Sequence, residues 1–137
     1  MTDLADLKVA GPIYEPLNQP FWDGAENGAL KVQRCGACDR RVFYPRPLCP
    51  HCWSDALEWV TASGQARLKS FSEIWKPGHP GWIPVAPYLV GLVELAEGPT
   101  LLSHILADGN AVSVGDRLTF APTNIGGRTL PCFRKDD

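Results

Sequence analysis

Four of the five cysteines in this chain occur as two C-x-x-C pairs, the residue type and spacing of a tetrahedral metal site. Cys35 and Cys38 form the first pair and Cys49 and Cys52 form the second, with ten residues between the pairs. Each pair presents two sulfurs from one tight turn, so two pairs complete four-fold coordination. Four thiolates leave no open position for water or substrate. The pattern therefore predicts one structural, non-catalytic zinc ion.

The spacing leaves some alternatives open. Iron in a rubredoxin-like site would use the same ligands, although zinc is favoured for a closed four-cysteine site. A thioredoxin-like redox role would need a βαβ context, which the sequence does not offer. Residues 29–55 are too few to bury a core, so the metal is expected to stabilise that module. His51 is expected to face solvent, and the fifth cysteine, Cys132, to be a buried thiol.

The charges of the chain are unevenly distributed. The formal net charge is −2, so no overall positive field would attract nucleic acid. Residues 31–46, however, contain five basic side chains and one acid. This cluster is either an ordinary solvated surface or a local anion site beside the cysteines. Residues 1–10 lack the apolar core of a signal peptide, and no apolar stretch approaches the ~20 residues of a membrane span. We therefore expect a cytoplasmic protein with reduced thiols.

The remaining pattern is mainly that of β-structure. Thirteen glycines and thirteen prolines argue against a helix bundle, because both residues break helix interiors. One short helical segment is expected at 18–28, where Phe21 and Trp22 would be packing anchors. A stiff proline-rich loop is expected at 76–87. Alternating patterns predict strands at 29–33, 56–62, 66–75, 88–95, 100–106, 117–121 and 129–134. Turns at Glu97-Gly98 and Gly126-Gly127 complete a pattern that fits a small barrel, with an open sandwich as the alternative.

The order of these motifs resembles the DUF35 family over roughly residues 17–134. The matching segments are Phe21-Trp22, Gly28–Cys38, Phe43–Arg46, Cys49–Cys52, Leu57–Gly64, Pro87–Gly98 and Val114–Leu118. The resemblance implies a mainly β fold in three parts. These are an N-terminal helical, partner-docking segment (1–28), a rubredoxin-like zinc ribbon (29–56) and a five- to six-stranded OB-fold barrel (57–137).

The resemblance also implies a function. Members of this family act as non-catalytic partners of thiolase-like enzymes of the lipid-transfer-protein type or of MaoC-like hydratases. They help to bind or channel acyl-CoA, in some cases within an aldolase complex that acts on a steroid side chain. By analogy, this chain would be a subunit of a lyase or acyltransferase complex and would form a heterotetramer with a dimeric enzyme.

The phosphates of CoA need arginine or lysine side chains, and its acyl arm needs an apolar slot. Arg46 and Arg40 are the first candidates for the phosphates, followed by Arg34 and Arg41. His79 and Trp82 in the proline-rich loop are candidates for the rim of the apolar slot.

Two other function classes remain open at this point. Zinc ribbons and OB-folds also bind single-stranded nucleic acid, but residues 57–137 hold seven basic and eight acidic side chains, which argues against a basic groove. A free-standing enzyme would have to rely on three histidines, and neither His79 nor His104 has a carboxylate or nucleophile adjacent in sequence.

Overall fold

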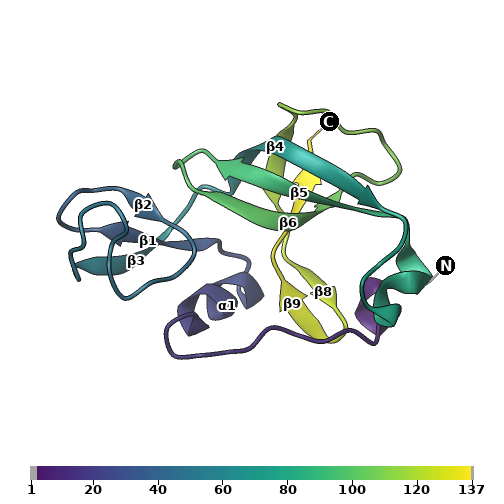
Figure 1. Cartoon of the computed structure of the whole chain (residues 1–137), viewed down its shortest axis with the longest axis horizontal. Helices are drawn as coiled ribbons and strands as arrows, with labels where there is room; N and C mark the ends of the chain where they lie inside the picture. Colours follow the sequence, from purple (N-terminus) through teal and green to yellow (C-terminus); the bar gives the residue numbers. More distant parts are fainter. Residues whose placement is uncertain (1–2, 137) are drawn as a thin grey trace.

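The computed structural model describes residues 3–136, and its strands form a three-stranded sheet, a closed barrel and a two-stranded hairpin (Figure 1). Residues 1, 2 and 137, which belong to the predicted terminal segments, lie outside the described residues. The two 3₁₀ helices and the α-helix are η1 (Leu4–Asp6), η2 (Pro80–Val85) and α1 (Gln19–Glu26). The strands are β1 (Lys31–Cys35), β2 (Arg41–Val42), β3 (Leu57–Thr61), β4 (Gln65–Ile74), β5 (Tyr88–Leu95), β6 (Thr100–Leu106), β7 (Arg117–Phe120), β8 (Thr123–Ile125), β9 (Arg128–Leu130) and β10 (Cys132–Lys135).

Five strands close the barrel in the order β10, β6, β5, β4 and β7. β10 runs parallel to β6, and the other neighbouring strands are antiparallel. A register shift between Leu68 and Ser70 marks a bulge in β4, the long strand that pairs with both β5 and β7. A Cβ atom at Gly91 would lie 2.8 Å from the Ser70 carbonyl oxygen, so glycine permits this close approach. The closed barrel confirms the predicted OB-fold and excludes the open sandwich.

The small sheet, in the order β2, β1 and β3, shares its core with the barrel. Phe21 from α1 and Val32 from β1 belong to the same buried cluster as Leu68, Leu118 and Phe133 of the barrel. α1 has Pro20 in its first turn and ends at Glu26, followed by the capping residue Asn27 and by Gly28 with a positive φ of 80°, as the sequence predicted. The ribbon and the barrel are therefore held together by one continuous apolar core.

The N-terminal segment crosses the protein's own surface before it reaches α1, passing the β8–β9 hairpin (Figure 1). Leu7 is buried there, and the Gly126 N–H donates to the Leu4 carbonyl oxygen at 3.0 Å. Arg128 donates to the Pro12 carbonyl oxygen at 3.2 Å and lies over the Tyr14 ring. Residues 4–12 are thus held against this chain's own β8–β9 hairpin. No helix among residues 3–136 is long and apolar enough to cross a bilayer.

Two predictions of secondary structure are wrong in detail. The single strand expected at 129–134 is two strands, β9 and β10, because Pro131 has no N–H with which to continue a ladder. The chain leaves the β8–β9 hairpin at Pro131 and enters the barrel. The second difference is that the loop expected at 76–87 contains the short helix η2. The strand β8 was not predicted, because its three residues are too few to show a period.

The barrel core makes a testable contribution to stability. Leu118 is fully buried, whereas Leu102 on the outer barrel face keeps 58% of its surface exposed. We expect Leu118→Ala to lower the free energy of unfolding by about 2–5 kcal/mol through the cavity that it leaves. Leu102→Ala is the matched control and should change the free energy by less than about 0.5 kcal/mol. Urea titration followed by tryptophan fluorescence measures both, and equal losses would contradict this description of the core.

Candidate functional site

The four paired cysteines converge on one point at the end of the ribbon. Their Sγ atoms all lie within 4.8 Å of one another. Two of the separations are 3.6 Å (Cys35 to Cys52) and 3.7 Å (Cys38 to Cys49). Tetrahedral coordination with zinc–sulfur bonds of about 2.3 Å would place the sulfurs about 3.8 Å apart. The four cysteines therefore form a metal-binding site whose geometry fits zinc.

The two cysteine turns have nearly the same backbone. Asp39 and Trp53, each directly after the second cysteine of a pair, adopt positive φ angles of 64° and 65°. Their N–H groups donate to the carbonyl oxygens of Cys35 and Cys49, both at 2.8 Å. The Cys38 N–H points at the Cys35 sulfur at 3.5 Å, and this contact is the largest of several hydrogen bonds that together lower the pKa of Cys35 to about 6. Such N–H···S contacts favour the thiolate, the form that binds a metal.

The fifth cysteine plays no part in this site. Cys132 is fully buried at the start of β10, as the sequence predicted. Burial raises its pKa to about 11, so the thiol stays protonated at neutral pH.

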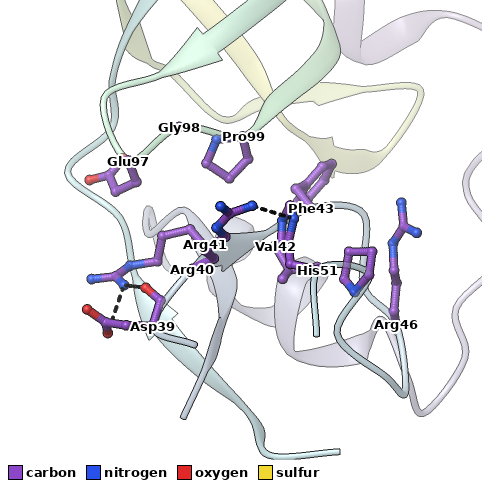
Figure 2. A pocket seen from close by; sticks show the side chains of 11 residues that line it. Asp39, Arg40, Arg41, Val42, Phe43, Arg46, His51, Glu97, Gly98 and Pro99 are labelled. Atoms are coloured by element: carbon purple, nitrogen blue, oxygen red, sulfur yellow. Dashed lines mark hydrogen bonds and ion pairs between the residues drawn. The ribbon is translucent and has the colours of Figure 1, made fainter. Parts of the chain in front are cut away.

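A cavity of about 770 Å³ lies next to the metal site, between the ribbon and the barrel. Figure 2 shows arginine side chains from the ribbon on one side and the β5–β6 turn on the other. Arg40 donates to the His51 ring nitrogen Nδ1 at 3.1 Å, and His51 itself lies between two cysteine ligands. We call this space the arginine cavity, and its lining residues are Asp39, Arg40, Arg41, Val42, Phe43, Arg46, Pro50, His51, Glu97, Gly98 and Pro99.

Glu97 contributes a carboxylate from the barrel side of the arginine cavity. Its Oε2 atom accepts a hydrogen bond from the Ser63 N–H at 2.8 Å. Its Oε1 atom is buried and has no hydrogen-bond partner among the described residues. An unpaired buried carboxylate oxygen costs free energy, so the cavity favours a donor in this position.

The structure brings together only three of the six predicted ligand-binding residues. Arg40, Arg41 and Arg46 line the arginine cavity, although Arg46 points away from the other two in Figure 2. Arg34 is not among the lining residues, and its guanidinium group is already paired with Glu58 at 2.7 Å and with Asp39.

The other two predicted residues lie on the proline-rich loop of the barrel. His79 precedes η2, and its ring nitrogen Nδ1 accepts the Gly81 N–H at 2.9 Å, which caps that helix. Trp82 packs against His104 on β6 with ring centroids 4.6 Å apart. His51 and Glu97 were not predicted as part of a ligand site, because only the tertiary structure places them beside the arginines.

A second, apolar cavity of about 340 Å³ shares one wall residue, Phe43, with the first one. Phe43 lines both cavities and forms the boundary between them. The Tyr44 hydroxyl accepts the Leu102 N–H at 3.3 Å and so joins the ribbon to β6. We call this space the apolar cavity, and its lining residues are Glu15, Leu17, Asn18, Phe21, Trp22, Phe43, Tyr44, Pro45, Leu101, Leu102 and Pro131.

Comparison with known proteins agrees with this architecture. Residues 22–58 match the family model for the rubredoxin-like zinc ribbon domain of ChsH2, and residues 59–121 match that for its C-terminal OB-fold domain. The solved structure of an Ltp2-ChsH2(DUF35) aldolase is similar, with a TM-score of 0.78 and 32% identity over 91% of this chain and 98% of that chain. The chain belongs to the DUF35 family.

Two curated relatives of this DUF35 protein are subunits of enzymes that act on CoA thioesters. One is the probable enoyl-CoA hydratase alpha subunit of Thermomonospora curvata, 38% identical over 63% of this chain. The other is the benzoylsuccinyl-CoA thiolase subunit BbsA of Geobacter metallireducens, 28% identical over 74% of this chain. The chain spans only 27% of the length of the hydratase subunit and 68% of the length of the thiolase subunit.

Loss of one cysteine ligand should remove the metal and loosen the ribbon of this DUF35 protein. We expect Cys38→Ser or a strong chelator to abolish stoichiometric metal content and to lower the melting temperature, because the ribbon has little core of its own. Elemental analysis and thermal melting measure the two effects. Cys132→Ala is the control, since it should lower stability by cavity formation but retain one metal ion. Unchanged melting after metal removal would contradict a structural role for the site.

Proposed function

We propose that this DUF35 protein is a non-catalytic accessory subunit of a thiolase-like or hydratase-like enzyme, and that it binds acyl-CoA where the ribbon meets the barrel. The arginine cavity is the observation that supports this proposal best. Its lining holds three arginines against two carboxylates, Asp39 and Glu97, in a chain whose formal net charge is −2. Such a local concentration of positive charge suits an anionic ligand, and the phosphates of CoA are anions of this kind.

The arginines are well placed to bind phosphate groups. Arg40 and Arg41 follow Cys38 within three residues, so the metal site restrains the backbone from which they extend. The contact from Arg40 to His51 holds that guanidinium group at the cavity wall. A guanidinium presents paired N–H donors that match phosphate oxygens, and a restrained backbone reduces the entropy lost on binding. Arg34 is not included in this proposal, because it does not line the cavity and is paired with both Glu58 and Asp39. Arg41 lines the cavity and has a longer contact with Asp39, at 3.6 Å.

The apolar cavity would receive the pantetheine arm of the same ligand. It adjoins the arginine cavity at Phe43, and most of its wall is made of apolar and aromatic side chains. Sites for small ligands combine such walls with a few fixed polar groups, which here would be the arginines at one end. One extended CoA thioester would then occupy both cavities.

The metal in this proposal is zinc, and its role is structural. The four sulfurs of Cys35, Cys38, Cys49 and Cys52 would saturate a tetrahedral ion, so zinc would supply folding energy to the ribbon and no reaction step. We further propose the three-part division predicted from the sequence, with residues 1–28 as the segment nearest the partner enzyme. On a dimeric thiolase-like enzyme, two copies of this chain would give a heterotetramer.

Removal of two arginines tests whether the arginine cavity binds the phosphates of CoA. We expect Arg40→Ala combined with Arg41→Ala to weaken CoA binding at least about tenfold, since charge-assisted hydrogen bonds to phosphate are lost. Isothermal titration calorimetry of the full chain with CoA measures the change. Wild-type binding should also weaken as salt concentration rises.

Arg117→Ala is the matched control, because Arg117 is an exposed arginine of β7 that lines neither cavity. It should leave the affinity for CoA unchanged. Unchanged affinity in the double variant would contradict the proposed phosphate site. Tight, salt-sensitive binding of single-stranded oligonucleotides without binding of CoA would instead support a nucleic-acid-binding function.

The partner is tested by co-purification from the organism in which the chain occurs. A tagged full chain should retain a thiolase-like or MaoC-like protein at a 1:1 ratio, and analytical ultracentrifugation should give the mass of a heterotetramer. Recovery of the chain without either enzyme type would contradict an accessory role.

A further inference from the structure

The three-stranded sheet of the ribbon ends in an open edge at β3. β3 pairs with β1 on one side, and no strand of the described chain lies on its other side (Figure 1). The barrel is closed, and the other strands outside it that have an open side, β2, β8 and β9, contain two or three residues each. With five residues, β3 therefore has the longest open edge among residues 3–136. Such an edge presents unpaired N–H and C=O groups to another chain.

The hydrogen bonds between β1 and β3 determine which backbone groups of β3 remain free. The Ala62 N–H, directly after β3, donates to the Leu30 carbonyl oxygen at 2.8 Å. In an antiparallel pair the residues that bond to the neighbouring strand alternate with residues that face away from it, so the register fixes both sets. The residues whose N–H and C=O groups face the open side are Leu57, Trp59 and Thr61, and within residues 3–136 these groups have no partner.

β3 lacks most of the features that keep edge strands from pairing. It contains no proline or lysine, and its register with β1 runs without a bulge. Its one charged side chain, Glu58, is paired across the sheet with Arg34 at 2.7 Å. Trp59 and Val60 are half-buried and are residue types that favour strands. The edge is therefore regular and suited to the addition of a further strand.

The open edge of β3 is complementary to itself. When two β3 strands run antiparallel about a two-fold axis at Trp59, Leu57 of each copy faces Thr61 of the other, and Trp59 faces Trp59. Each facing pair exchanges two hydrogen bonds, so every outward N–H and C=O group of β3 is satisfied. Glu58 then lies opposite Val60, so no like charges face each other. A shift of this register by two residues would leave either Leu57 or Thr61 without a partner in β3.

We propose that a second copy of this chain pairs with the open edge of β3 and joins the two ribbon sheets into one. The strand order β2, β1, β3 of one copy continues as β3, β1, β2 of the other. This inference goes beyond the proposed function, because it requires neither a CoA ligand nor a partner enzyme. One strand pair buries less surface than a standard protein interface, so the dimer is expected to be weak.

Sedimentation equilibrium of the metal-loaded full chain tests the association. We expect mainly monomer at about 10 µM and mainly dimer at about 1 mM, as for a dissociation constant of about 100 µM. Thr61→Pro should weaken association at least about tenfold, because proline removes an outward N–H and still fits an edge strand. Thr61→Val is the matched control, since it keeps the N–H and the β-branched shape and should leave association unchanged. Thermal melting checks that both variants are folded.

Amide hydrogen exchange identifies the paired edge without a substitution. At about 1 mM the amides of Leu57, Trp59 and Thr61 should be protected, and at about 10 µM they should exchange freely, because the dimer dissociates. The amides of Glu58 and Val60 should stay protected at both concentrations, since they face β1. Mass spectrometry with fragmentation to single residues distinguishes the two sets.

Three results would overturn the pairing of two copies. The first is a chain that stays monomeric at about 1 mM, and the second is a dimer that folded Thr61→Pro does not weaken. The third is a dimer in which the amides of Leu57, Trp59 and Thr61 still exchange freely, because another surface then forms the contact. Protection of these amides only after addition of a thiolase-like or hydratase-like enzyme would assign the edge to that enzyme and would equally overturn the proposal. Binding of CoA is unaffected by any of these results, so the proposed function is tested separately.

Discussion

The convergence of four cysteine sulfurs is the constraint on which the rest of the candidate site depends. The ribbon's own buried cluster consists of Cys35, Val42 and Cys49, with Cys38 and Leu57 packed against it, so most of its core is made of potential ligands. Without a metal, this module has too little apolar surface to offset the conformational entropy of its loops. Arg40, Arg46 and His51, which line the adjacent cavity, lie in those loops, and Arg41 begins the two-residue strand β2 beside them. The metal therefore determines where the positive charges stand.

A second constraint positions the ribbon against the barrel. Phe21 of α1, Leu30 directly before β1 and Val32 of β1 belong to the barrel core, which makes the two modules one packing unit. The Tyr44 hydroxyl adds a polar contact to β6, and Ser63 between β3 and β4 holds Glu97. Because this interface is closely packed, the space between ribbon and β5–β6 turn has a defined shape. A ligand would meet a preformed cavity, which lowers the cost of binding.

The same arrangement separates charge along one strand. β6 begins beside the arginine cavity, passes the apolar cavity and ends at an aromatic cavity with acidic residues at its rim. The two ends of β6 thus lie in surroundings of different charge, although the basic and acidic side chains of the barrel nearly balance in number.

Local patterns in the sequence were sufficient to predict the metal-binding site, two barrel strands and the α-helix. Two C-x-x-C turns identify a metal site because each depends on only four consecutive residues. The alternation at 88–95 and 100–106 predicted β5 and β6 with the observed bounds, since two neighbouring strands of a half-exposed sheet carry a period of two. Pro20 and Gly28 likewise bracketed α1 through their own backbone preferences. The order of these motifs pointed to the DUF35 family.

Contacts between distant segments were decided only by the tertiary structure. Arg34, Arg40, Arg41 and Arg46 look equivalent in sequence, yet ion pairs with Glu58 and Asp39 take Arg34 out of the group that lines the cavity. Glu97 joins the arginines from more than fifty residues away, and Trp82 reaches His104 instead of the ribbon. The sequence by itself identified the cysteines of the metal-binding site, the class of fold and the local excess of positive charge at residues 31–46. Which charges share a cavity depends on closure of the barrel and on its common core with the ribbon, and neither has a local signature in the chain.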